Sequence, residues 1–392
     1  MTPSRLEPEQ RELLDLVAGY ARREVAPRAA GDEQAGRFPA DLFTSLGGMD
    51  LMGLPFDAEH GGGGQPYAVY LRVVEELSRA FLTVGLGLSV HTLATWAVAA
   101  YASDEVRKEW LPRMVSGELL GAYSLSEPGS GSDAAGLRTR AVRDGDDYVV
   151  TGTKAWVTHA GVAGFYVLLC RTGDHPTRGV SALLVPAGTP GVEFPPPERK
   201  LGMRSSPTGQ IVFTDSRVPA RNLLGEEGEG FRIAMSALDG GRLGIAACSV
   251  GLAQAALDAA VTYAGGRRQF GQAIGDFQGV GFMLADMATG VEAARALYAE
   301  GADRRDLGQP HARMAAMAKL FASDTAMAVT TDAVQVHGGY GYVTDYPVER
   351  YLREAKVLQI VEGTNQVQRL VISRDLLRGA AAGDTPARPP TA

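Results

Sequence analysis

In the stretch 355–374, the one carboxylate is that of Glu362, which lies in a short Gly-Thr-Asn break between two segments with helical patterns. A carboxylate at a joint between helices has a restricted backbone and partly apolar surroundings, which raise the pKa of a glutamate above its usual value of about 4.3. A glutamate with a raised pKa is an effective base near neutral pH, so Glu362 is a candidate for proton abstraction. The spacing also fits a structural interpretation, in which the carboxylate lies in the first turn of a helix and is stabilised by the helix dipole.

Two helices must position this carboxylate. Upstream, Asp345 and Pro347 give a helix-start signal, and no breaker follows before the Gly-Thr-Asn break. Downstream, Asn365 and Gln368 resemble a capping box, and an apolar stripe at helical spacing follows. Arg374 lies on that stripe, where a charged side chain is unusual for a face that only packs. The pattern predicts a helix–loop–helix unit with the candidate base in its loop.

The composition is that of an ordinary globular protein, with 45% hydrophobic and 21% charged residues among 392. The net charge of −7 and the lack of a basic run argue against nucleic-acid binding. Cys170 and Cys248 have no metal-ligand spacing, so we interpret them as buried thiols in a reducing compartment and expect no metal site. The N-terminus lacks a signal-peptide core, and no apolar run reaches the eighteen or so residues that span a membrane. We expect a soluble, cytoplasmic protein.

The helical and β patterns divide the chain into parts. Residues 1–119 carry a helical period, and 120–228 hold short β-rich runs separated by glycine and proline. Helical periodicity returns in 229–380, and the polar, proline-containing tail 381–392 is predicted to be disordered. The helical stretch near the C-terminus includes an apolar stripe of Met317, Leu320, Phe321 and Ala328.

A Gly/Ser-rich motif, YSLSEPGSGSD, occupies 123–133. Gly129 and Gly131 carry no Cβ, so a flat ring can approach the backbone closely there. The motif is not GxGxxG and precedes no helical pattern, which excludes a Rossmann interpretation. On composition alone it is equally a simple turn.

Three further motifs have both a functional and a structural interpretation. In KAWVTHAG (154–161), Trp156 is by default a strand aromatic packed in the β part. In ALDGGRLGIAACSVG (237–251), Asp239 and Arg242 have the spacing of a common and weak i, i+3 helix ion pair. In RRQFGQAIGDFQ (267–278), Arg267 suits bidentate phosphate binding, although a solvated basic turn also fits.

With QVHGGYGYVTDYPVERYLREAK and VEGTNQVQRLVISR near the C-terminus, these motifs resemble the acyl-CoA dehydrogenase family, most closely its short-chain and butyryl-type members, over about 13–377. The resemblance implies an α+β fold with an N-terminal helical domain, a small central β-barrel or sandwich domain and a C-terminal four-helix bundle. It implies bound FAD and α,β-dehydrogenation of an acyl-CoA thioester to the trans-2-enoyl-CoA. Glu362 matches the catalytic base, which takes the α-proton while a hydride passes from Cβ to the flavin.

The resemblance also assigns binding residues by position in this sequence. Matched FAD contacts are Leu125, Ser126, Trp156, Thr158, Arg267, Phe270, Phe277, Gln278, Gln335, Gly338, Gly339, Thr364 and Gln366. Matched substrate contacts are Ser132, Asp239, Arg242, Gly363 and Arg374. Isovaleryl-type members carry the base at the position of Gly241, which cannot act here, and His159-Ala160 departs from the Asn-Gly of many members.

The resemblance extends to partners and assembly. In the family, the contacts matched by 267–278 and 335–339 come from a neighbouring subunit, which implies a homotetramer built as a dimer of dimers. Electron-transferring flavoprotein is the implied electron acceptor, and short or branched acyl groups are favoured as substrates. Two enzyme alternatives keep the fold, an oxidase that uses O₂ and an enzyme for carrier-protein thioesters. A non-enzymatic scaffold is the alternative from another class, and the intact Glu362 and Arg242 argue against it.

Overall fold

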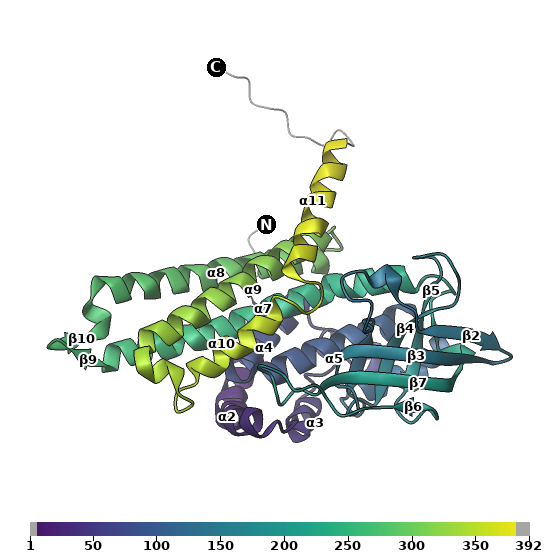
Figure 1. Ribbon diagram of the computed structural model, residues 1–392, viewed down its shortest axis with the longest axis horizontal. Helices are drawn as coiled ribbons and strands as arrows, with labels where there is room; N and C mark the ends of the chain where they lie inside the picture. The colour runs from purple at the N-terminus through teal and green to yellow at the C-terminus, as the bar shows by residue number, and fades with distance from the viewer. Residues whose placement is uncertain (1–5, 382–392) are drawn as a thin grey trace, which may run out of the picture.

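The structure, a computed structural model, describes residues 6–381 (Figure 1), so the predicted disordered tail lies outside the described residues except for Ala381. The chain begins with helices, as the helical period predicts. They are α1 (Pro8–Tyr20), a π-helical turn (Ala21–Val25), α2 (Ala26–Ala35), α3 (Ala40–Gly48), α4 (Tyr67–Ala80), α5 (Leu82–Tyr101) and α6 (Asp104–Val115).

A sheet follows, and in Figure 1 it occupies one end of the molecule. Its strands are β1 (Gly121–Ser124), β2 (Arg140–Asp144), β3 (Asp147–Thr158), β4 (Phe165–Arg171), β5 (Val180–Pro186), β6 (Val192–Glu193), β7 (Thr208–Pro219) and β8 (Leu223–Leu224). They form one eight-stranded sheet in the order β6-β7-β3-β2-β4-β5-β8, with β1 pairing parallel to β4. Strands β4 and β5 are buried along almost their whole length, so both faces of the sheet are covered at its centre.

The remaining described elements form a bundle of long helices. They are α7 (Gly230–Gly266), the short hairpin β9 (Arg268–Gln269) and β10 (Gln272–Ala273), α8 (Gln278–Asp306), α9 (Ala312–His337), α10 (Val348–Leu358) and α11 (Asn365–Ala381). This order of helices, sheet and helices confirms the predicted fold class. The predicted domain boundaries, between residues 119 and 120 and between residues 228 and 229, remain a proposal.

Helix α9 packs through small side chains. Its buried positions include Ala315, Ala318, Ala322 and Ala326, which allow close approach to α7 and α8. The apolar stripe noted in the sequence does lie on α9, but Met317 and Phe321 point outward and are exposed. Close helix contact favours the small residues on the inner face, so the larger apolar residues mark the outer one.

Two described helices, α5 and α7, are long and apolar enough to cross a membrane by length and composition. Most of each apolar window is buried inside the protein, 89% for α5 and 78% for α7. Core helices of folded proteins pass the same test, so this pattern is weak evidence for a membrane span.

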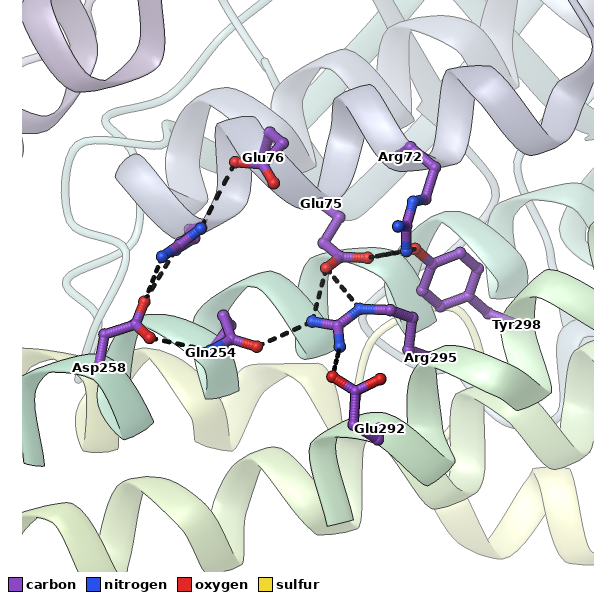
Figure 2. Close-up of polar contacts among 9 residues, drawn as sticks. Arg72, Glu75, Glu76, Gln254, Asp258, Glu292, Arg295 and Tyr298 are labelled. Carbon is purple, nitrogen blue, oxygen red and sulfur yellow. Dashed lines mark hydrogen bonds and ion pairs between the residues drawn. The ribbon is translucent and has the colours of Figure 1, made fainter. Parts of the chain in front are cut away.

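A buried polar network joins helix α4 to helices α7 and α8 (Figure 2). The carboxylate of Glu75 accepts hydrogen bonds from Tyr298 Oη and from Arg295 Nε, the latter at 2.9 Å. Arg295 in turn donates to Gln254 at 2.9 Å, and Gln254 donates to Asp258 at 2.9 Å. A buried carboxylate is tolerated only when it is paired in this way, so the network specifies how α4 docks on the bundle.

Replacing Tyr298 with phenylalanine tests this network. The change leaves a buried carboxylate without one donor, and a hydrogen bond to a charged group contributes about 1.5–3 kcal/mol. We expect a loss of about 2 kcal/mol in the free energy of unfolding, seen as a lower midpoint of urea unfolding at fixed protein concentration. Tyr342, which is 87% exposed, provides the control, and Tyr342→Phe should leave the midpoint unchanged. Equal midpoints for both variants would show that the network does not stabilise the fold.

Candidate active site

The loop that carries Glu362 joins α10 to α11 in a strained conformation. Glu362 has φ of 52° and Gly363 has φ of 92°, both in the left-handed region that an L side chain rarely adopts. Lys319 Nζ donates to the carbonyl oxygen of Gly363 at 2.9 Å. Gln368 Nε2 donates to the carbonyls of Gly363 at 2.8 Å and Glu362 at 3.2 Å. Side chains from two helices therefore hold the loop against its own strain.

The predicted capping box at Asn365 and Gln368 is wrong. Helix α11 begins at Asn365, and the capping contact comes one residue earlier, from the Val367 N–H to Thr364 Oγ1 at 3.3 Å. Gln368 instead turns back to the loop, where its side chain donates to the carbonyls of Glu362 and Gly363. The buried Asn365 side chain instead contacts helix α9, at Lys319, Ser323 and Asp324.

The carboxylate of Glu362 is buried against helix α7. Neither of its oxygens has a hydrogen-bond partner among the described residues. A Cβ built on Gly241 would lie only 2.0 Å from Glu362 Oε2, so the carboxylate occupies the space that a side chain at 241 would fill. Burial raises the pKa of Glu362 to about 7, while the positive charges of Arg242 and Lys319 act in the opposite direction. An unpaired carboxylate with a pKa near 7 is suited to accept a proton.

Lys319 is a buried cation beneath this loop, with no exposed surface. Its ammonium donates to Asn365 Oδ1 at 2.8 Å as well as to the Gly363 carbonyl. Burial lowers the pKa of Lys319 to about 8, and the nearby Glu362 carboxylate counteracts this effect. Lys319 therefore fixes the loop and also biases Glu362 towards its charged form.

Replacing Lys319 with methionine should shift the pH dependence of dehydrogenation. If Glu362 is the base, as the family resemblance implies, the wild-type rate should rise with pH through its pKa of about 7. Without the cation that opposes burial, the pKa of Glu362 rises and the rate profile moves to higher pH. We expect turnover at pH 7 to fall by roughly three- to tenfold and to recover in part at pH 9.

The control for this experiment is Lys108→Met, which removes an exposed lysine on α6 and should leave the profile unchanged. Both variants are compared by the pH dependence of flavin reduction. A Lys319→Met profile that falls equally at every pH would mean that this lysine affects loop geometry alone.

A small cavity of about 10 Å³, which has room for about one water molecule, lies beside Gly241 on α7. Residues of α4, α5, α7 and α8 line it, and Gly240 and Gly241 form the α7 wall. The Glu362 carboxylate occupies the space above Gly241, a residue that also lines this cavity.

A buried ion pair fixes the loop that follows β1. Lys154 Nζ donates to Glu127 Oε1 at 2.8 Å and to the carbonyl of Leu125 at 2.9 Å. The Ala155 N–H donates to the carbonyl of Ser126 at 2.9 Å. Burial lowers the pKa of Lys154. Burial acts to raise the pKa of Glu127, but Lys154 and the hydrogen bonds from Arg138 and Thr139 together hold it below its usual value. Leu125 and Ser126 therefore present a rigid backbone next to β3.

Trp156 is displayed on β3 beside this loop. The pairing of β3 with β7 shifts register between Lys154 and Val157, and Trp156 lies in this irregularity with φ of 61°. Its side chain is 63% exposed. Bulges of this kind redirect a side chain beside a functional site, and an exposed indole next to a rigid loop fits a planar ring such as the flavin of FAD. The default interpretation of Trp156 as a packed strand aromatic is therefore wrong.

Comparison with known proteins agrees with this geometry. The N-terminal, middle and C-terminal domain models of acyl-CoA dehydrogenases match residues 7–118, 122–216 and 228–377. An acyl-CoA dehydrogenase of Bacillus subtilis (strain 168) is 46% identical over 373 residues, which cover 95% of this chain and 98% of that protein. The chain belongs to the acyl-CoA dehydrogenase family.

Two solved structures share the fold of this acyl-CoA dehydrogenase. Butyryl-CoA dehydrogenase from Megasphaera elsdenii has a TM-score of 0.94 at 39% identity, covering 96% of this chain and 100% of that chain. A chain of the structure described as the electron transferring flavoprotein of Acidaminococcus fermentans has a TM-score of 0.94 at 43% identity, covering 95% and 99%. The protein is an FAD-dependent oxidoreductase that dehydrogenates acyl-CoA thioesters.

The acyl-CoA dehydrogenase fold brings several predicted site residues together around the loop and cavity. Glu362, Gly363 and Thr364 lie in or beside the loop, and Asp239 pairs with the buried Arg242 at 2.6 Å near the carboxylate. Leu125, Ser126, Trp156 and Thr158 lie together where β1 ends and β3 runs past it. Ser132, Gln366 and Arg374 are exposed.

The other predicted FAD contacts lie elsewhere. The β9–β10 hairpin is at the end of the bundle opposite to the sheet (Figure 1). Phe270 at this hairpin is 94% exposed, with its ring 6.1 Å from that of Phe277, and Arg267 lies over the ring of Tyr340 at 5.6 Å. This exposed group also includes Gln278, Gln335, Gly338 and Gly339. Within one protomer it is therefore separate from Glu362.

The sequence analysis did not identify the roles of the residues that hold the two site loops in place or line the cavity. Lys319, Lys154 and Gln368 hold the two loops, and Tyr67 and Arg305 line the cavity. One signal was available for Lys319, since a lysine amid Ala-Ala-Met-Ala and Leu-Phe-Ala implies a buried charge that needs a partner. No sequence pattern signals Lys154, Tyr67 or Arg305, because their partners lie far away in the chain, whereas Gln368 contacts carbonyls only five and six residues earlier.

Proposed function

We propose that Glu362 is the base that removes the Cα proton of the acyl-CoA beside Gly241. The observation that carries this proposal is the buried carboxylate without a hydrogen-bond partner, held above a glycine at the cavity wall. With a pKa of about 7, this carboxylate has a high affinity for a proton, and a large fraction of it is still unprotonated at neutral pH. Bound FAD supplies the acceptor for the hydride that leaves Cβ.

The strained loop also offers a hydrogen-bond donor for the thioester. Within residues 6–381, the backbone N–H of Glu362 donates no hydrogen bond. It is free to donate to the thioester carbonyl, where negative charge develops as the Cα proton leaves. A preorganised donor of this kind contributes about 3 kcal/mol to transition-state stabilisation. Lys319 and Gln368 keep this N–H in place by holding the adjacent carbonyls.

Arg242 and Asp239 complete the substrate side of the proposal. Arg242 is buried beside Glu362 and paired with Asp239, so a positive charge lies close to the developing enolate. We assign these residues, with Ser132, Gly363 and Arg374, to binding of the acyl-CoA. Leu125, Ser126, Trp156, Thr158, Thr364 and Gln366 are assigned to FAD.

The remaining assignments concern the partners. The likeness to a butyryl-CoA dehydrogenase favours a short acyl group. The likeness to a chain from an electron transferring flavoprotein structure supports such a flavoprotein as the electron acceptor. The exposed aromatic residues at the β9–β10 hairpin support a homotetramer, in which this end of one protomer reaches the FAD of a neighbour.

The experiment that tests this function is an anaerobic titration of the purified yellow protein with acyl-CoAs of graded length. A short acyl-CoA should bleach the flavin spectrum within seconds, and an electron transferring flavoprotein should restore it. Rapid formation of hydrogen peroxide in air would show that O₂, rather than an electron transferring flavoprotein, is the electron acceptor. If only carrier-protein thioesters bleach the flavin, the substrate is a carrier-bound acyl group rather than an acyl-CoA. A protein that cannot bind FAD would contradict the whole assignment.

A further inference from the structure

We propose that His159 is a positioning residue for FAD, which ties the flavin-facing end of β3 to the start of β1 and to the helices α3 and α5. The inference rests on the proposed function, because it takes Trp156 and Thr158 on β3, with Leu125 and Ser126 after β1, as flavin contacts. It gives a role to a position at which this chain departs from the Asn-Gly of many members of the family.

Two buried histidines hold the peptide groups of Gly121, the first residue of β1. His159 Nδ1 donates to the carbonyl oxygen of Gly121 at 2.9 Å, and the Gly121 N–H donates to His91 Nδ1 at 3.0 Å. Neither histidine has any exposed surface. Burial lowers the pKa of His91 to about 3 and that of His159 to about 4, so both rings are neutral near pH 7. One ring therefore acts as a donor and the other as an acceptor, and together they fix the start of β1.

The ring of His159 reaches from the sheet to the N-terminal helices. Its centroid lies 5.8 Å from that of Phe38 and 5.7 Å from that of Phe43 on α3. A Cβ built on Gly87 of α5 would lie 3.0 Å from His159 Nε2, so the ring also contacts α5 closely. His91, the partner on the other side of β1, belongs to the same helix. These contacts fix the end of β3 relative to α3 and α5.

The backbone of His159 is strained and held by its neighbours. Its φ is 68°, in the left-handed region that L side chains rarely adopt. Its N–H donates to the carbonyl of Pro207 at 2.8 Å, and its own carbonyl accepts from the N–H of Ala163 at 2.9 Å. Backbone strain that surrounding contacts maintain in this way is typical of residues with a functional constraint.

The bond from His159 is one of two tethers between β1 and β3. In the described sheet, β1 pairs with β4 and β3 pairs with β2 and β7, so the strand ladder itself does not join β1 to β3. At the other tether, the Ala155 N–H donates to the carbonyl of Ser126 at 2.9 Å, one residue before Trp156. The two tethers therefore enclose the flavin-facing segment 156–158. Binding residues are effective only when they are held within about 0.5 Å of the productive geometry, so loss of one tether should weaken FAD binding.

The test compares FAD release from the wild-type, His159→Phe and His159→Asn holoenzymes. Phenylalanine keeps a ring beside α3 but has no donor, whereas asparagine loses the ring and keeps a donor next to Cγ. Ultrafiltration of each holoenzyme at graded dilutions gives the dissociation constant of FAD. We expect His159→Phe to bind FAD about three- to tenfold more weakly, the effect of one lost hydrogen bond, and His159→Asn to recover most of this loss. Trp156 alone among the three tryptophans is exposed, and bound FAD should quench its emission less completely in His159→Phe.

His175→Phe is the matched control. His175 is exposed on the loop between β4 and β5, where its Nδ1 accepts from the N–H groups of Thr177 and Arg178 at 3.2 and 3.0 Å. The control removes a histidine hydrogen bond from the same sheet region and should keep the wild-type affinity for FAD.

A purely structural role of His159 would lower the thermal midpoint of His159→Phe equally with and without excess FAD and leave the dissociation constant unchanged. That result would overturn the proposal. If His159→Phe does not fold, His159→Asn and His159→Leu provide the same comparison, because they are similar in size and differ in the donor. Equal FAD affinities for these two variants would also overturn the proposal. A wild type that does not bind FAD would instead contradict the proposed function.

Discussion

Glu362→Gln is expected to bind FAD and acyl-CoA as the wild type does and to lose dehydrogenation. Glutamine keeps the shape of the side chain and fills the space above Gly241, but it cannot accept a proton. General base catalysis contributes about 10²–10⁴-fold, and Cα deprotonation has no substitute base at this site, so we expect turnover to fall by roughly 10³-fold or more. Flavin reduction in a single turnover measures the loss directly.

Two further measurements show whether the loss of activity comes from the missing base rather than from misfolding or lost substrate binding. The visible spectrum of bound FAD shows that the variant is folded, and the concentration of acyl-CoA at half-maximal spectral change shows that the substrate site is intact. Because burial of the charged carboxylate is unfavourable, the neutral glutamine should leave the stability equal or slightly higher at pH 8. Turnover within threefold of the wild type would contradict the role of Glu362.

Gly241→Ala is expected to separate stability from activity. The added Cβ would lie 2.0 Å from Glu362 Oε2, so the carboxylate has to leave its place. Gly241 is inside α7, where alanine is favoured over glycine by about 0.5–1 kcal/mol, so the helix itself gains from the change. We expect the rate of flavin reduction to fall by roughly 10²-fold, since a displacement of about 1 Å has an effect of this size.

The matched control is Gly31→Ala in α2, where nothing lies within 4 Å of the added Cβ. Both variants replace glycine by alanine in a helix, and both should unfold at the wild-type temperature or above it. Only the change at 241 should slow flavin reduction. Equal rates for the two variants would mean that the carboxylate does not use the space above Gly241 during catalysis.

Local patterns in the sequence were sufficient for the fold class and for the motifs that meet at the site. Helical periodicity and short β-rich runs depend on neighbouring residues, and these expectations are confirmed by the helices, sheet and bundle. The likeness of the motif around Glu362 to a known family was enough to assign Glu362 as the candidate base, because the loop and its flanking helices form one continuous segment.

The contacts that hold the site residues in place could not be predicted from local patterns in the sequence. The capping prediction at Asn365 failed because Lys319, 46 residues earlier, competes for the asparagine side chain. The local pattern alone favoured a packed strand aromatic at Trp156, whereas the family resemblance assigned it to FAD, and the register shift against β7 turns its side chain outward. Arg305 enters the cavity through contacts with Tyr67 and Gly240, which are distant in sequence. Each of these depends on long-range packing that periodicity does not encode.

The central claim is that Glu362 removes the Cα proton, and deuterium exchange at Cα tests it most directly. (Methylthio)acetyl-CoA has a sulfur atom in place of Cβ and therefore has no hydride to give, so proton removal is measured alone. In D₂O, the wild-type holoenzyme should introduce deuterium at Cα rapidly, and Glu362→Gln should do so no faster than buffer without enzyme. Deuterium incorporation by the variant at the wild-type rate would show that another group is the base.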